Sequence, residues 1–238
     1  MAVRNLLYAR KYPVNEHIQI EIPTVGEILD QEDAYYSMVS LITATPYDMM
    51  VQLDDMKIDF MEINDFDLFV LMFQALKTKD TSLIFGELDL KKFIAMVNPQ
   101  NNTVVLRDPE TGVTIDRNIH AMICQAIRKI HHLKRNYRKP ANGEARKYML
   151  QRARQKMKRR QNRVEDSQIE ELIVALVNTE QFHYNFDTVR NLTIYQFNES
   201  VQQVIKKIDF DNKMHGIYAG TISAKDMSQD ELNWLTHK

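Results

Sequence analysis

The sequence predicts a mainly α-helical protein of the α+β class with a small β component. Apolar residues recur with the i, i+3, i+4, i+7 spacing of an amphipathic helix in several long segments. Glycine and proline are scarce, at 6 residues each in a chain of 238, whereas folds built around phosphate-binding loops or barrels usually contain more glycine. The period-two alternation that is typical of strands is confined to short stretches.

One short strand followed by helices is expected in the N-terminal part. Ile18, Ile20 and Ile22 alternate with polar residues, and this strand ends at Pro23. Thr24 and Glu27 have the spacing of a capping box, which predicts the start of a helix. Further helical segments up to residue 98 are expected at 34–44, 46–56, 65–77 and, as one or two turns, within 81–98.

A β-hairpin and a helix are expected in the middle of the chain. Two apolar runs, Val104–Leu106 and Val113–Ile115, flank the turn residues 108–112, so the hairpin spans about 103–115. Residues 117–136 follow a helical pattern, and a Pro- and Gly-containing loop at 139–144 interrupts it.

The C-terminal part is expected to be helical. Ser167 with Glu170 and Thr193 with Gln196 have capping-box spacing. The expected helices are a long basic one at 144–163 and others at 168–178, 193–207 and, short and capped by Ser228, 230–235. We expect an acidic, mostly helical domain with the small β element at 1–138, and the basic helix plus the C-terminal helical region at 139–238. One continuous domain is the alternative.

Charge is strongly segregated along the chain, although the net charge is only −1. Residues 117–163 contain 16 Lys or Arg residues and one acid, Glu144, whereas residues 27–67 contain 11 acids and one base, Lys57. The densest basic stretch is the expected helix at 144–163. Its candidate binding residues, for a partner or for phosphate, are Arg146, Lys147, Arg152, Arg154, Lys156, Lys158, Arg159, Arg160 and Arg163.

Three interpretations of this basic segment stay open. It resembles a helix that lies along a phosphate backbone, so nucleic acid is one partner class. A basic helix could equally pack against an acidic helical partner or against the acidic region 27–67, in its own chain or in a second copy, which predicts self-association through 27–67 and 117–163. It could also be a solvated face. On a helical wheel Ala145, Met149, Ala153 and Met157 form a narrow apolar seam.

No catalytic, cofactor or metal site is predicted. The chain has no phosphate-binding or dinucleotide fingerprint, and the 209–213 segment lacks the Gly and the twelfth-position acid of a calcium loop. His131 and His132 are adjacent, so they point in different directions and are expected to be a solvated pair or one whose side chains extend towards the helix N-terminus. The single cysteine, Cys124, lies in an apolar run and is expected to be a buried thiol. We therefore expect a non-enzymatic protein.

No membrane segment is expected, because no window approaches about 18 consecutive apolar residues. The N-terminus lacks the long apolar region of a signal peptide. A single cysteine in a chain of this length favours a reducing compartment.

The stretches IPTVGEILDQEDAYYSMVSLITATPYDMMVQLDDMKIDF and LIVALVNTEQFHYNFDTVRNLTIYQFNESVQQVIKKIDFDNKMHGIYAG resemble a family of tailed-bacteriophage and prophage proteins from Gram-positive hosts. The resemblance covers most of the chain. Some members resemble tail assembly chaperones, which associate with the tape measure protein. It implies a helical morphogenesis protein of the host bacterial cytoplasm that binds a phage tail protein such as the tape measure protein. The alternative function is a nucleic-acid-binding phage protein that uses residues 117–163.

Overall fold

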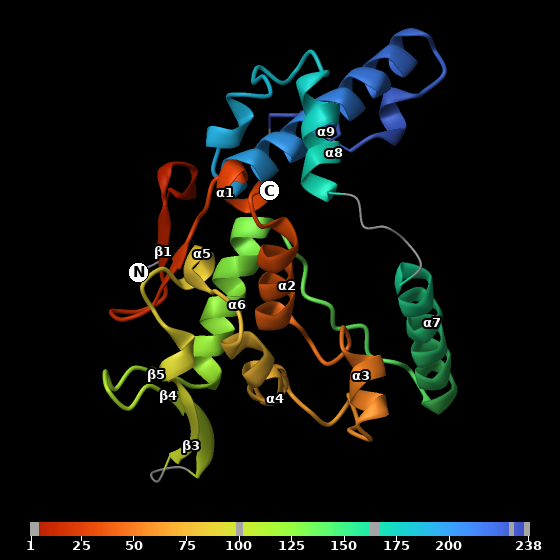
Figure 1. Cartoon of the computed structure of the whole chain (residues 1–238). Coiled ribbons are helices and arrows are strands. Elements are labelled where there is room, and N and C mark those ends of the chain that lie inside the picture. The colour runs from red at the N-terminus through yellow and green to blue at the C-terminus, as the bar shows by residue number, and fades with distance from the viewer. Residues whose placement is uncertain (1–4, 99–101, 162–166, 229–230, 236–238) are drawn as a thin grey trace. The chain divides into compact units, whose positions relative to one another are not determined.

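The computed structural model describes residues 5–98, 102–161, 167–228 and 231–235 of the chain (Figure 1). The α-helices of these residues are α1 (Val25–Leu29), α2 (Glu32–Thr43), α3 (Met50–Asp55), α4 (Asp65–Lys77), α5 (Ser82–Phe85), α6 (Arg117–His131), α7 (Gly143–Gln161), α8 (Gln168–Val177) and α9 (Ile194–Tyr218). Short 3-10 turns lie at Leu6–Tyr8, Leu90–Lys92, Val189–Asn191 and Ala224–Asp226. The mainly helical α+β class is confirmed.

The described residues form two small antiparallel sheets. In the first, β1 (Lys11–Pro13) pairs with β2 (Gln19–Glu21). In the second, the strand order is β3 (Ile94–Asn98), β4 (Thr103–Arg107) and β5 (Thr114–Ile115). The expected N-terminal strand and the expected hairpin are therefore both present, the hairpin as β4 and β5.

Two compact units make up the chain. The first contains residues 1–23 and 30–166, and the second contains residues 24–29 and 167–238. The basic helix α7 thus groups with the N-terminal residues, and α1 groups with the C-terminal ones. Compactness does not test whether a segment folds independently, so the expected domains at 1–138 and 139–238 stay a prediction.

In the first unit α2, α4 and α6 pack on one another (Figure 1). Side-chain caps explain where α4 and α6 start. The side chain of Asn64 accepts hydrogen bonds from the first turn of α4, and the Asp116 side chain caps α6 by accepting from the backbone of Ile119 at 2.8 Å. α6 ends at His132, which adopts the left-handed conformation at φ 55°. Its buried side includes Ile123, Ala126 and Ile130.

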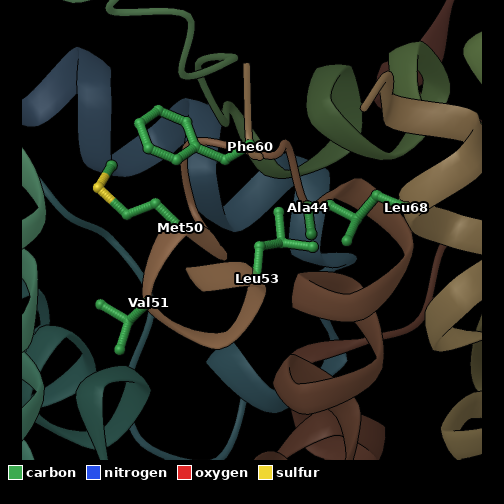
Figure 2. Packing of buried hydrophobic residues seen from close by; sticks show 6 residues of the cluster. All are labelled: Ala44, Met50, Val51, Leu53, Phe60 and Leu68. Carbon is green, nitrogen blue, oxygen red and sulfur yellow. The ribbon is translucent and has the colours of Figure 1, made fainter. Parts of the chain in front are cut away.

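A hydrophobic cluster next to this helical packing positions α7. It consists of Ala44, Met50, Val51, Leu53, Phe60 and Leu68, and Figure 2 shows these side chains around α3. Met149, Leu150 and Ala153 of α7 are partly buried against the same cluster. The apolar contacts of α7 are therefore made with α3 and its flanking loops.

The second unit is built on α8, α9 and the short helix α1. Thr193 forms a full capping box with Gln196 at the start of α9, as expected. The backbone N–H of Val25 donates to the Leu192 carbonyl at 2.8 Å, and Thr24 forms an isolated β-bridge with Thr193. Residues far apart in the chain are thereby joined within this unit.

Four expectations about elements need correction. Ile94–Asn98, placed among helical turns, forms strand β3, because a five-residue apolar run does not distinguish a strand from a buried helical turn. The helix expected to begin at Thr24 is short, at Val25–Leu29, and a second one begins at Glu32. The helix expected to end at 207 continues to Tyr218. Ser228 and Glu231 exchange capping hydrogen bonds, yet the described residues 231–235 form turns instead of a helix.

Candidate functional site: the basic helix and its acidic contacts

The basic helix α7 starts directly after the predicted loop. The Asn142 side chain accepts a hydrogen bond from the backbone N–H of Ala145 at 2.8 Å, and the Asn142 carbonyl accepts from Arg146 at 3.0 Å. An asparagine before the first turn is a favourable N-cap, because its side chain satisfies one of the free N–H groups of the helix start. The loop residues therefore define where α7 begins.

The inner face of α7 combines apolar contacts with two ion-pairing arginines. Met149, Leu150 and Ala153 contact the hydrophobic cluster. Arg146 and Arg154 lie one turn before and one turn after Leu150, so they share this face. The expected seam at Ala145, Met149, Ala153 and Met157 is thus right for Met149 and Ala153 and omits Leu150.

Both inner arginines bind carboxylates of the acidic region. Arg154 Nη2 lies 2.6 Å from Asp54 Oδ2 and 2.6 Å from Asp55 Oδ1, at the end of α3. These two hydrogen bonds raise the pKa of the Arg154 guanidinium further above its already high value. Arg146 Nη2 lies 3.0 Å from Asp59 Oδ1 and its guanidinium stands 5.3 Å from the centre of the Phe60 ring.

Two further ion pairs join the basic segment to the acidic one outside α7. Arg135 Nη2 lies 2.9 Å from Asp65 Oδ2, and Arg117 Nη2 lies 3.9 Å from Asp67 Oδ1. Part of the basic segment therefore neutralises the region 27–67 of its own chain. Association between two copies through the same regions stays a prediction.

The outer face of α7 keeps most of the candidate binding residues exposed. Lys147, Arg152, Lys156, Lys158 and Arg159 are all exposed. Among the described residues Lys147, Lys156, Lys158 and Arg159 form no ion pair, and Arg152 stands 5.7 Å from the centre of the Tyr148 ring. The side chain of Arg160 and the whole of Arg163 lie outside the described residues.

The structure therefore divides the candidate binding residues into two groups. The inward group is Arg146 and Arg154, which bind acidic residues at the end of α3 and in the loop after it. The outward group, which we call the outer basic face, is Lys147, Arg152, Lys156, Lys158 and Arg159. Arg146, Leu150 and Arg154 form a row of charged and apolar residues, which a criterion based on apolar residues alone does not detect. Their separation of four positions places them on one helix face and is the signal that identifies the row.

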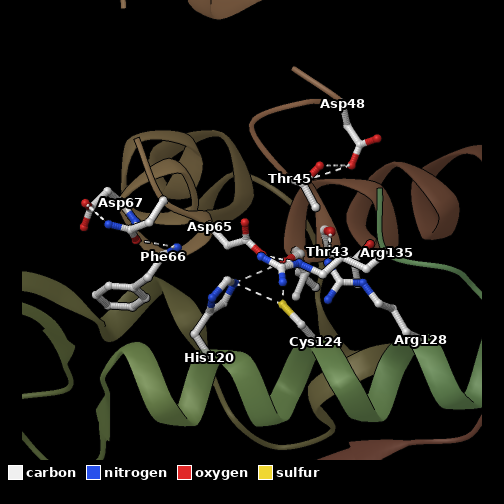
Figure 3. Close-up of polar contacts among 12 residues, drawn as sticks. Thr43, Thr45, Asp48, Asp65, Phe66, Asp67, His120, Cys124, Arg128 and Arg135 are labelled. Carbon is white, nitrogen blue, oxygen red and sulfur yellow. Dashed lines mark hydrogen bonds and ion pairs between the residues drawn. The ribbon is translucent and has the colours of Figure 1, made fainter. Parts of the chain in front are cut away.

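A second polar cluster lies along α6, and Figure 3 shows its side chains. The Cys124 thiol donates to the Ile42 carbonyl at 3.2 Å, and His120 Nε2 lies 3.2 Å from the same oxygen and 3.3 Å from Cys124 Sγ. Burial raises the pKa of the thiol to about 12 and lowers the pKa of His120 to about 4. The pair is therefore neutral near pH 7.

The expectation of a solvated His131–His132 pair is wrong for His131. His131 is buried at the end of α6, where its Nε2 lies 2.8 Å from the Tyr35 hydroxyl. Burial, with a smaller effect of His132, lowers the pKa of His131 to about 4. No periodicity of charged residues marks this contact, because the partner is 96 residues away in the chain.

Two other kinds of feature are absent from the described residues. Within them, no group of three or more His, Cys, Asp or Glu side chains is arranged to hold a metal ion. No helix among them is long and apolar enough to cross a membrane.

Residues 158–238 match the family model of the YomV second domain, which is associated with phages and prophages. The match begins in the last turn of α7 and includes α8 and α9. None of the curated proteins and none of the solved structures compared with the chain matches it. The C-terminal third of this chain is thus similar to a phage-associated domain, which supports its assignment as a phage protein.

Proposed function

We propose that this is a non-enzymatic phage morphogenesis protein, similar to tail assembly chaperones, that binds a helical tail component such as the tape measure protein. The outer basic face of α7 is the docking surface. Its partner is a helix with an acidic side, acting in the cytoplasm of the host during assembly. The observation that carries this proposal is the division of α7 into a held inner face and an exposed outer face.

The arrangement suits docking because α7 is already held in place on its inner side. Arg146, Arg154 and the apolar seam fix the helix, so its backbone does not have to be ordered when a partner binds. Within α7 itself, Gly143–Gln161, Glu144 in the first turn is the only acidic residue. Such a surface increases the rate of encounter with an acidic partner and favours one orientation.

Charge reversal on the outer face tests the proposal. The test variant carries Arg152→Glu, Lys156→Glu and Arg159→Glu, and the matched control carries Lys129→Glu, Arg138→Glu and Lys139→Glu, three exposed cations outside α7. Tagged protein is purified from cells that produce the phage, with and without nuclease, and co-purifying proteins are identified by mass spectrometry.

The docking proposal expects a long helical tail protein to co-purify after nuclease treatment with the parent chain and with the control, but not with the test variant. Retention of that partner by the test variant would show that the outer basic face is not the docking surface. Loss of every protein partner after nuclease treatment would contradict the morphogenesis role.

A second candidate function is nucleic-acid binding by the same face. The observation that favours it is the set of exposed cations without ion pairs among the described residues. On duplex DNA, the logarithm of the association constant falls linearly with the logarithm of the salt concentration, and each phosphate contact contributes about 0.9 to the magnitude of that slope. The test variant is then expected to reduce that slope by about two to three, and an unchanged slope would exclude this function for α7.

A further inference from the structure

A pocket of about 450 Å³ lies beside α6, separate from the outer face of α7. Its lining combines the aromatic residues Tyr47, Phe60 and Phe66 with residues of α6 and of the segment that follows it. Its volume and its mixture of aromatic walls with a few polar groups are typical of sites for small organic molecules.

Three arginines and one carboxylate line this pocket. The arginines are Arg117, Arg128 and Arg135, and the acid is Asp65, which Arg135 binds. Since His120 is neutral near pH 7, the formal charge of the lining is +3 from the arginines and −1 from Asp65, a net of +2.

The arginines retain unused hydrogen-bond donors. Arg128 donates to the Thr43 carbonyl through Nη2 at 2.5 Å, and Arg135 binds Asp65 through Nε and Nη2 (Figure 3). The 3.9 Å separation of Arg117 from Asp67 exceeds a hydrogen-bond distance. A guanidinium has five N–H donors, so each arginine has donors left for a ligand.

From these contacts we infer that the pocket binds a small anion with a flat apolar body, of about the size of a mononucleotide. The phosphate or carboxylate group is held by the arginines, where it balances the excess positive charge. The flat body lies against the aromatic residues. Arginine suits this role because its planar fork matches the geometry of both kinds of anion.

The pocket chemistry makes three substitutions informative. Arg135→Gln and Arg117→Gln each remove a donor and a charge at exposed positions, so the fold is expected to persist. Asp65→Asn removes the competing acid and frees Arg135 for the ligand. Arg138→Gln is the matched control, since Arg138 is exposed and does not line the pocket.

The experiment is calorimetric titration of the full chain with adenosine monophosphate, benzoate and inorganic phosphate at low ionic strength. We expect one saturable site for adenosine monophosphate or benzoate and weaker binding of phosphate alone. Arg135→Gln and Arg117→Gln are expected to weaken binding about tenfold each, a typical loss for a charged hydrogen bond. Asp65→Asn is expected to strengthen it, and Arg138→Gln to leave it unchanged.

Each contrary outcome overturns the inference. If none of the three probes binds saturably, the pocket is not a binding site. If phosphate binds as tightly as the two ring-bearing probes, the aromatic residues do not contribute to binding. An equal loss in Arg138→Gln shows general surface attraction instead of a pocket. Circular dichroism of each variant separates loss of the ligand from loss of the fold. None of these variants changes a residue of α7, so the docking proposal is tested separately.

Discussion

At the residue scale, Cys124 and His120 have the spacing of a catalytic pair but not its charge state. Their side chains are 3.3 Å apart, yet burial raises the pKa of the thiol to about 12 and lowers that of the imidazole to about 4. A nucleophilic cysteine needs the opposite shift, towards thiolate. The contact therefore satisfies two buried polar groups next to the Ile42 carbonyl.

We expect the Cys124 thiol to be unreactive in the folded protein. A shift of the thiol pKa from 9.0 to about 12 lowers the thiolate fraction by roughly a thousandfold, and burial limits access further. Labelling with a thiol reagent at pH 8 should be very slow and should become complete after denaturation. Because Cys124 is the single cysteine of the chain, the signal has one source. Fast labelling under native conditions would contradict this account.

Stability is expected to fall as the pH drops from about 6.5 to 4. His120 and His131 are buried with pKa values of about 4, against 6.5 in an exposed histidine. In this interval the unfolded chain takes up protons that the folded chain does not, so the free energy of unfolding decreases with falling pH. Above pH 6.5 both states are neutral and this loss is absent. Over the whole interval, each of the two pKa shifts lowers the free energy of unfolding by about 3 kcal/mol.

Urea unfolding between pH 4 and 7.5 measures this dependence. Replacing either buried residue, as His120→Asn or His131→Asn, should flatten the pH profile although it also lowers stability at pH 7. His17→Asn is the control, since His17 is exposed. If stability fell equally steeply with decreasing pH in all variants, groups other than His120 and His131 would be responsible for the loss of stability.

Sequence patterns predict the local roles of residues better than their distant contacts. Thr24, Asn64 and Thr193 occupy cap positions, as their spacing and residue types suggest. The burial of His131 against Tyr35 depends on packing between α2 and α6, which no local pattern records. The inward direction of Arg154 similarly depends on Asp54 and Asp55, about 100 residues earlier.

At the element scale, α7 is a helix whose position depends on one face. Its inner side has no fully buried residue among those described, and its apolar contacts are partly buried. The ion pairs of Arg146 and Arg154 are also partly exposed, and such pairs contribute little and weaken with salt. The apolar seam is therefore expected to contribute most to the docking of α7.

We expect Leu150→Glu to release α7 without unfolding the rest of the first unit. The substitution places a charge against the hydrophobic cluster, whereas Gln151→Glu introduces the same residue at the neighbouring exposed position. Limited trypsin digestion should cleave Leu150→Glu faster than the control at the basic residues 152–159. The main thermal transition should remain. Equal cleavage rates in both variants would show that the seam does not hold α7.

The elements differ in how well the sequence predicts them. Amphipathic helices such as α4, α6 and α8 are marked by spacing and by caps. β1 and β3 were missed because each is short, and β3 is apolar without the alternation that identifies a strand. The pairing of β3 with β4 supplies its hydrogen bonds, and pairing is a property of the fold.

At the scale of the whole molecule, the two compact units interleave along the sequence. The chain leaves the first unit at Pro23, contributes residues 24–29 to the second and returns at Asp30. Gly26 lies close to the Arg190 backbone there, where an added Cβ would come within 3.2 Å of the carbonyl oxygen. The sequence patterns predicted a domain boundary at residue 139. They do not reveal that residues 24–29 belong to the second unit, because this depends on contacts between residues more than 160 positions apart.

We expect the fragment 167–238 to fold poorly alone. It lacks Val25, whose N–H binds the Leu192 carbonyl, and Thr24, which bridges to Thr193. Circular dichroism should show reduced helicity and a broad thermal transition, and addition of a peptide of residues 20–31 should increase both helicity and cooperativity. A scrambled peptide of the same composition is the control. A sharp transition in the fragment without peptide would show that α1 is dispensable.

Because residues 24–29 belong to the second unit, they can make their final contacts only after the distant residues of that unit have been translated. Thr193, the bridge partner of Thr24, is synthesised 169 residues after it. At typical bacterial rates of 5–20 residues per second this delay is roughly 10 to 30 seconds. During that time the apolar side chains of Val25 and Ile28, both fully buried in the finished protein, have no final partner. The nascent chain therefore carries Val25 and Ile28 without their final contacts until the residues around Thr193 have been synthesised.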